Sequence, residues 1–162
     1  MTAFTAWKFD TPEGADHAAS LLEAAEADQL VKVMDHAVVS WPPGEKNPKA
    51  SHGHDDTARG AGWGALWGLL FGALFAVPVL GLAAGGAIGA LNKAHEKLGI
   101  SKEQIEALRG SVTEGTSALF VVTEQGNLDR LGERFRGVDM TLLQTNLTDV
   151  ERDELLEAIG HK

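Results

Sequence analysis

Residues 60–92 carry no charged side chain, and glycine recurs within this stretch every four residues. Positions four apart lie on one face of an α-helix. Each glycine in a water-exposed helix costs about 1 kcal/mol relative to alanine, so a glycine ridge is favoured only where another backbone approaches closely. The stretch therefore predicts two closely packing helical arms. The ridge of the first arm is Gly60, Gly64, Gly68 and Gly72, and that of the second is Gly81, Gly85 and Gly89.

Pro78 lies between the two arms and is the predicted hairpin turn. Trp63 and Trp67 stand one helical turn apart near the start of the first arm, beside Leu66 and Leu70. Two interpretations of the tryptophans are open. They are anchors at a membrane–water interface, or they are packing residues in a protein interior.

The sequence before the uncharged stretch predicts a strand, a helix and a second strand. Ala3–Phe9 is rich in threonine and aromatic residues, which favours a strand. Thr11 is the expected N-cap of a helix that runs from Pro12 to about Ala27. Leu30–Trp41 alternates apolar and polar residues and is the second predicted strand, and the Pro- and Gly-rich residues 42–57 are a predicted loop.

The sequence after the stretch repeats the pattern. Ser101 and Gln104 form a predicted capping box at the start of a helix, and an unbroken apolar run marks a buried strand at 117–124. A helix at 127–135 and a strand at 140–147 follow, and Thr148 and Glu151 form a second predicted capping box at the start of a last helix. The fold class is therefore α+β, a ferredoxin-like sandwich of two β-α-β units interrupted by a glycine-zipper helical hairpin. The expected segments are 1–57, 58–98 for the hairpin, and 99–162.

The composition argues against several classes of partner and chemistry. The net charge of −9 and pI near 5.0 argue against nucleic acid as a partner, because phosphate backbones repel an acidic chain. The absence of cysteine excludes disulfides and thiolate chemistry. Residues 1–10 lack the pattern of a secretory signal, so a cytosolic start is expected.

The sequence offers one candidate metal site. Imidazole and carboxylate ligands suit zinc or similar ions, although the same residues are typical of a solvated loop. No nucleophile–base arrangement or phosphate-binding loop is recognised, so we expect a protein that is not an enzyme and has no cofactor. His17 and His36 are expected on the surface. The candidate metal ligands are His52, His54, Asp55 and Asp56.

Several segments together resemble a bacterial family of unknown function, domain-of-unknown-function family 1269. The resemblance implies a membrane protein, the usual description of its members, and brings no activity, ligand or catalytic residue with it. The segments that carry it are Gly64–Gly72, Val77–Gly81, Gly85–Leu91, Leu98–Ile100, Gly115–Phe120 and Leu143–Leu147.

These observations favour a homo-oligomer that associates with a lipid bilayer through the hairpin, at the cytosolic face of the bacterial cytoplasmic membrane. A soluble, cytoplasmic self-assembling shell or scaffold, with the hairpins bundled inside, is the alternative. A single sheet requires the chain to return to the side it left, so each arm has about 16 residues. Such an arm is about 24 Å long at ~1.5 Å per residue, short of the ~30 Å hydrocarbon core.

Overall fold

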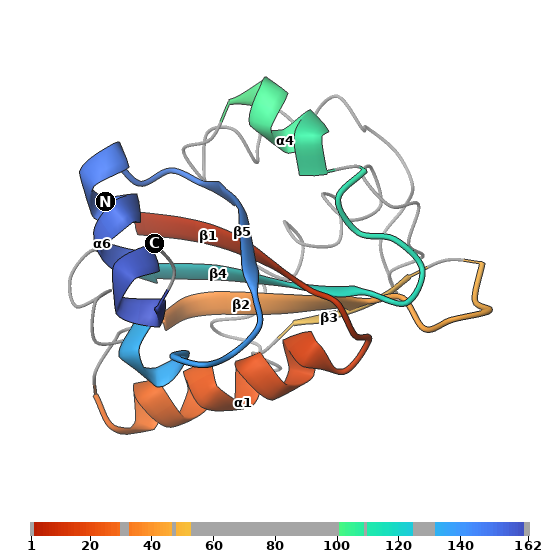
Figure 1. Ribbon diagram of the computed structural model, residues 1–162, viewed down its shortest axis with the longest axis horizontal. Helices are drawn as coiled ribbons and strands as arrows, with labels where there is room; N and C mark the ends of the chain where they lie inside the picture. The colour runs from red at the N-terminus through yellow and green to blue at the C-terminus, as the bar shows by residue number, and fades with distance from the viewer. Residues whose placement is uncertain are drawn as a thin grey trace.

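The computed structural model describes residues 2–29, 33–46, 48–52, 101–108, 110–124 and 132–160 (Figure 1). The described elements form a sheet with α1 on one side and α4 on the other (Figure 1). In chain order they are β1 (Thr2–Phe9), α1 (Gly14–Ala27), β2 (Val33–Ser40), β3 (Lys49–His52), α4 (Lys102–Leu108), β4 (Ser117–Glu124), β5 (Thr141–Thr145) and α6 (Asp149–Ile159).

The sheet is five-stranded, in the order β3-β2-β4-β1-β5, and every neighbouring pair is antiparallel. Leu119 of β4 lies opposite Trp7 of β1 on one side and Val38 of β2 on the other. The central strand β4 follows the uncharged stretch in sequence, whereas both of its neighbours precede it. The two halves of the chain therefore complete one sheet, and the mixed α/β class predicted from the sequence is confirmed.

One face of the sheet, here called the first face, carries the helical layer. Five α1 residues at helical spacing are buried there, namely Ala15, Ala18, Ala19, Leu22 and Ala25. Leu155 and Ile159 of α6 join the same cluster, together with Phe135 and Met140 from the segment that precedes β5. These helical residues pack against the alternate side chains of the strands, among them Trp7, Phe9, Val38, Leu119 and Val121.

The start of α1 differs from the prediction. The helix begins at Gly14, and its N-cap residue Glu13 makes no side-chain capping bond. The Ser117 hydroxyl of β4 takes over this role, donating to the Thr11 carbonyl at 2.6 Å and accepting from the Ala15 N–H at 3.0 Å. The Ser40 hydroxyl of β2 donates to the Pro12 carbonyl at 2.7 Å. The Thr11 carbonyl therefore accepts a hydrogen bond from the sheet, and Thr11 is not the N-cap residue of α1.

Two strands also differ from the prediction. The residues expected to form a loop at 42–57 contain the edge strand β3, which pairs with β2. Its sequence, Lys-Ala-Ser-His, lacks the apolar alternation from which strands are predicted. In β2, an irregularity between Val33 and Asp35 shifts the register. Val33 therefore shares the first face with Val38, although strict alternation along the strand would place Val33 on the side of Ala37 and Val39.

Both predicted capping boxes are confirmed. Gln104 N–H donates to the Ser101 hydroxyl at 3.1 Å, and the Gln104 side chain accepts from the Ser101 N–H at 2.9 Å. Thr148 and Glu151 make the equivalent pair of bonds at the start of α6. The predicted helix at 127–135 lies largely outside the described residues; residues 132–134 are helical.

Gly132 should not tolerate a side chain. A Cβ added there would lie 2.9 Å from the Ala158 Cβ and 3.2 Å from the Leu155 carbonyl oxygen of α6. We expect Gly132→Ala to lower the free energy of unfolding by about 1–3 kcal/mol through overpacking. Gly110→Ala is the matched control, because an added Cβ there meets nothing within 4 Å. Urea denaturation of both variants measures the difference, and equal midpoints would contradict the close approach of this turn to α6.

The hydroxyl of Ser117 is expected to stabilise the fold measurably. The residue is fully buried, and Ser117→Ala removes the acceptor of the Ala15 N–H. Leaving a buried donor without its partner costs about 1–3 kcal/mol. Ser111→Ala removes a comparable bond to a carbonyl at an exposed site and should change stability by less than about 0.5 kcal/mol. If both variants denature alike, α1 does not depend on the serine in β4.

Candidate functional site

The face of the sheet that points away from α1, here called the second face, is the principal apolar surface left by the helical layer. Cross-strand partners share a face, and the register places Phe120 between Ala6 and Ala37, and Ala118 beside Val39. All side chains of this set have an exposed fraction of 0%. The set consists of Phe4 and Ala6 of β1, Ala37 and Val39 of β2, and Ala118, Phe120 and Val122 of β4.

The second face is uneven in height. Phe4 and Phe120 stack with their ring centroids 6.4 Å apart and their planes inclined by 27°. Next to Phe120 the neighbouring positions are alanines, Ala6 and Ala37 on the flanking strands and Ala118 on β4 itself. Alanine leaves room above the backbone that large side chains from another layer fill at the packing density of a protein interior. The second face therefore has an aromatic ridge beside a floor of alanines.

Helix α4 lies on the second face, at the edge formed by β5 (Figure 1). The Gln104 side-chain amide donates to the Gln144 side-chain oxygen at 3.1 Å and to the Thr145 carbonyl at 3.0 Å. Gln144 is paired with Ala6 and therefore belongs to this face. Leu108 at the end of α4 and Val112 in the turn after it are buried. These contacts attach α4 to the edge strand β5.

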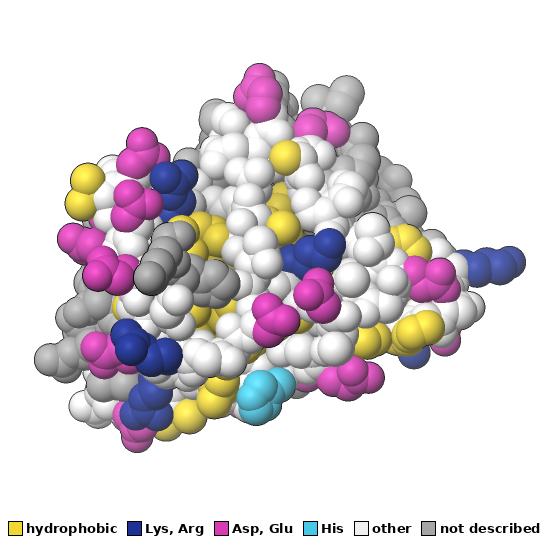
Figure 2. All heavy atoms as spheres, in the orientation of Figure 1, with side chains coloured by type: hydrophobic (Ala, Val, Ile, Leu, Met, Phe, Trp, Pro, Cys, Tyr) yellow, Lys and Arg dark blue, Asp and Glu magenta, His cyan; other side chains and the backbone are white. Residues whose placement is uncertain are grey.

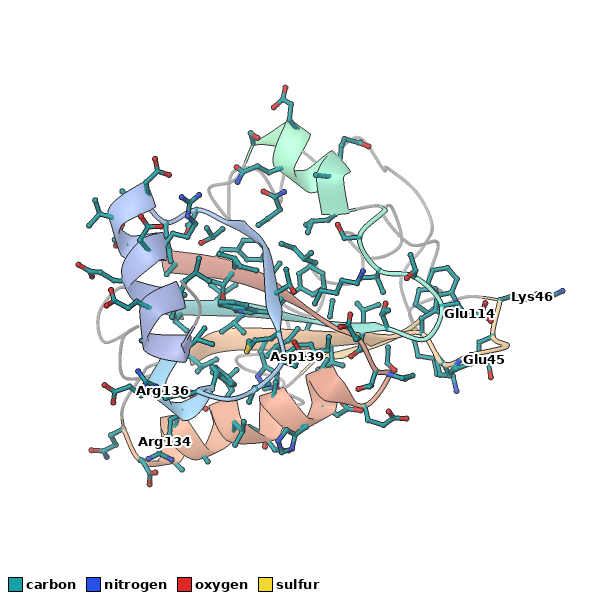
Figure 3. The ribbon with its side chains drawn as sticks, in the orientation of Figure 1. Glu45, Lys46, Glu114, Arg134, Arg136 and Asp139 are labelled. Atoms are coloured by element: carbon teal, nitrogen blue, oxygen red, sulfur yellow. The ribbon has the colours of Figure 1, made fainter. Side chains whose placement is uncertain are left out.

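Two labelled residues at one end of the sheet, Glu114 and Glu45, take part in hydrogen bonds that close loops (Figure 3). The Glu114 carboxylate accepts a hydrogen bond from the Gly44 N–H, and Gly44 has the positive φ of 87° that favours glycine. The Trp41 indole donates to the Glu45 carbonyl at 2.9 Å, and the Trp41 N–H donates to the Thr116 carbonyl at 2.9 Å. The turn between β2 and β3 is thus fastened to the turn that precedes β4.

The labelled arginines fasten the opposite end of the helical layer (Figure 3). Arg134 forms an ion pair with Asp28, the residue that ends α1. Arg136 donates to the Ala158 carbonyl of α6 at 3.2 Å. Both arginines are exposed, and an exposed ion pair contributes about 0.2–1 kcal/mol. These contacts join the segment before β5 to the end of α1 and to α6, so both arginines have a structural role.

His36 is not on the surface, where the sequence analysis placed it. Its side chain is 7% exposed, and its Nε2 lies 3.8 Å from a carboxylate oxygen of Glu23 on α1. The alternation from His36 to Ser40 is regular, and His36 lies on the side of β2 opposite Ala37 and Val39. That side is the first face, which α1 covers, so the position is buried although its neighbours in sequence suggested a polar surface. His17 of α1 is exposed, as expected.

The residues predicted to form sites lie outside the described part of the chain. They are the glycine ridges, the Pro78 turn, the candidate anchors Trp63 and Trp67, and His54, Asp55 and Asp56. His52 ends β3 with its backbone opposite Ala37, but its side chain is outside the described part. Within the described ranges, no three His, Cys, Asp or Glu residues are grouped as a metal would require. No helix built from the described residues has the length and apolarity to cross a membrane.

The exposed surface shows acidic side chains gathered over α6 (Figure 2). Asp149, Asp153, Glu154 and Glu157 are exposed, and Arg152 reaches Asp149 at 3.7 Å and Asp153 at 3.6 Å. Val150 on the same helix is 68% exposed and is the one large apolar side chain so exposed among the described residues. Scattered apolar residues of this kind are ordinary on protein surfaces.

Comparison with known proteins identifies the family. No curated protein and no solved structure matches this chain. A family model described as "Protein of unknown function (DUF1269)" matches residues 61–160. The matched region contains residues 61–92 of the uncharged stretch together with α4, β4, β5 and α6, whereas β1, α1, β2 and β3 precede it. Since the match covers more than half of the chain, this protein belongs to the DUF1269 family of proteins of unknown function.

Proposed function

We propose that this protein is a non-enzymatic homo-oligomer that associates with a lipid bilayer through the glycine-ridged segment 60–92. The observation that carries the proposal is the pairing of β4 with both β1 and β2. These partners lie on opposite sides of the segment in sequence, and a hydrogen-bonded sheet cannot be divided by a bilayer. The segment therefore leaves the domain and returns to it on one side, as a hairpin does.

The proposed hairpin is suited to shallow insertion. Each arm has about 16 residues, or about 24 Å of helix, compared with ~30 Å of hydrocarbon. An arm of this length enters one leaflet or thins the bilayer around it. In an inserted arm, Trp63 and Trp67 near its start would lie at the membrane–water interface, where tryptophan is favoured; the alternative for both is packing in a protein interior. The acidic domain, with a net charge of −9, remains in water on the cytosolic side.

A soluble assembly is the second candidate function. The glycine spacing that favours close packing in lipid also favours packing between copies in a water-free interior. In this case the hairpins bundle inside a shell or scaffold and the α/β domains face water. A large particle of defined mass without detergent supports this alternative, and pelleting with membranes that resists salt and alkali supports the first proposal.

We further propose that the domain is ferredoxin-like. Without β3, the strand order reads β2-β4-β1-β5, which is the order of two interlocked β-α-β units with antiparallel neighbours. The edge strand β3 is then an addition beside β2, and α1 occupies the first crossover. This interpretation makes the uncharged segment an insertion between the two units.

The hairpin model is tested by the accessibility of its ends. The chain has no native cysteine, so Ala58→Cys and Lys93→Cys introduce single labels. In inverted and right-side-out membrane vesicles, both thiols are expected to react with an impermeant maleimide from the cytosolic side. Labelling of the two positions from opposite sides would show that the segment crosses the bilayer once, which the shared sheet does not permit.

The glycine ridge is expected to drive self-association. Isoleucine at Gly68 or Gly72 separates the packed backbones and costs about 1–3 kcal/mol per overpacked site. We expect these variants to form smaller assemblies than the parent, measured by native mass spectrometry in detergent. Circular dichroism should be unchanged, because the paired strands lie outside the contact.

Leu69→Ile is the matched control, since it alters side-chain shape on the same arm without filling the ridge. It should assemble like the parent. If Gly68→Ile and Gly72→Ile also keep the parental mass, the glycines do not form an interface between copies.

A further inference from the structure

We propose that the second face of the sheet is the docking surface for the chain's own uncharged segment. The occupant is the first arm, and the side chains that fill the floor of alanines are Trp63, Leu66, Trp67 and Leu70. This inference deepens the proposed function, because it assigns one side of the arm to the domain and leaves the glycine side for lipid or a second copy.

The described elements on the second face are too small to account for its burial. Seven apolar side chains there have no exposed area. Helix α4 has seven residues and is therefore about 10 Å long. The five-stranded sheet is about 19 Å wide at ~4.8 Å per strand, and its eight-residue strands are about 26 Å long. The short helix α4 and the turn after it, which carry the buried Leu108 and Val112, are too small to exclude water from the whole surface, so we infer a further layer.

The path of the chain identifies that layer. Residues 53–101 begin after β3, at one edge of the sheet, and end at α4, which is bonded to β5 at the other edge. The connection must therefore traverse the width of the sheet. The first face is filled by α1, α6 and the segment before β5. Since α4 lies on the second face (Figure 1), we expect the connection to pass over that face.

Size complementarity selects the first arm. The small side chains of Ala6, Ala37 and Ala118 lie next to the stacked rings of Phe4 and Phe120. Interiors pack with few voids, so the opposing layer must supply large side chains there. At 100° per residue, Trp63, Leu66, Trp67 and Leu70 fall within one third of the helix circumference. The second arm offers only aliphatic residues of smaller volume, chiefly Leu80, Leu82, Ile88 and Leu91.

This arrangement separates the two sides of the arm. The glycines at positions 60, 64, 68 and 72 are centred more than a quarter turn from the large residues and point away from the sheet. Trp63 and Trp67 then belong to the interior of the domain, which resolves the two interpretations left open by the sequence. The glycine ridge becomes the outer surface, available to the second arm, a second copy or lipid.

Disulfide trapping in the full-length, cysteine-free chain tests the inference. Ala6→Cys, Ala37→Cys and Ala118→Cys are each combined with Leu66→Cys or Leu70→Cys, and the six proteins are oxidised at low concentration without detergent. Disulfides require Cβ atoms about 3.5–4.5 Å apart. We expect at least one pair to give a cross-linked product at the mass of a single chain, as seen by non-reducing electrophoresis and mass spectrometry.

Two matched controls define the geometry. Ala3→Cys replaces an alanine of β1 that is buried on the first face, and Ala65→Cys lies on the arm away from the large residues. Neither should cross-link when combined with the partners above. The inference is overturned if none of the six pairs forms an intrachain disulfide, if the controls form one equally well, or if the products join two chains.

The result is independent of the test of self-association. If the disulfide forms while Gly68→Ile keeps the parental mass, the docking of the arm stands and the glycine interface fails. If no disulfide forms while Gly68→Ile yields smaller assemblies, the glycine interface stands and the second face has another occupant.

Discussion

The pairing of β4 with both β1 and β2 is the interaction on which the rest of the structure depends. It joins strands from the two sides of the uncharged segment through two long antiparallel ladders. The ladders bring Leu119 and Val121 under α1 and place Ala118 and Phe120 on the opposite face. The serine that begins β4 also fixes the turn into α1, through bonds to Thr11 and Ala15. A strand contributed by the second half of the chain therefore organises the first half.

The same pairing has a thermodynamic consequence for the insertion. The contacts between β1 and β4 close a loop of more than a hundred residues, for example from Trp7 to Leu119. The entropic cost of closing a flexible loop grows only slowly with its length, so a long insertion is tolerated as far as chain entropy is concerned. Ordered packing within the insertion would lower this cost further. Because the uncharged segment lies between β3 and α4 in sequence, it interrupts neither the β1–β4 ladder nor the β2–β4 ladder.

Local patterns predicted much of the fold. The apolar run at 117–124, the alanine face of α1 and both capping boxes are signals contained in a few neighbouring residues. The errors arose where contacts with residues distant in sequence determine the local structure or the burial of a side chain. Thr11 is a reasonable cap in isolation, but the Ser117 hydroxyl engages its carbonyl. Alternation placed His36 on the side of β2 opposite Ala37 and Val39, but it could not show that α1 covers this side. The strand β3 was missed because it is a short edge strand whose sequence lacks apolar alternation.

The predicted site residues illustrate a different limit. Glycine periodicity indicates that a backbone comes close, yet it does not identify that backbone as lipid-embedded helix, second arm or second copy. The second face supplies information that the sequence lacks, because its apolar surface is assembled from three strands that are distant in sequence. Ala6, Ala37 and Ala118 are unremarkable one at a time, and only the register shows that they surround Phe120.

The small residues of the sheet and those of the uncharged segment can be understood together. In the docking proposed above, the first arm turns its large side chains toward the alanines of the sheet and its glycines outward, so it can pack on the domain and accept a close neighbour at the same time. The alanine floor matches the large side chains, and an identical or similar helix matches the glycines. Under this arrangement, association through the glycines leaves the sheet undisturbed. The domain would hold the arm in position, and the outward ridge would determine whether the protein meets lipid or another copy of itself.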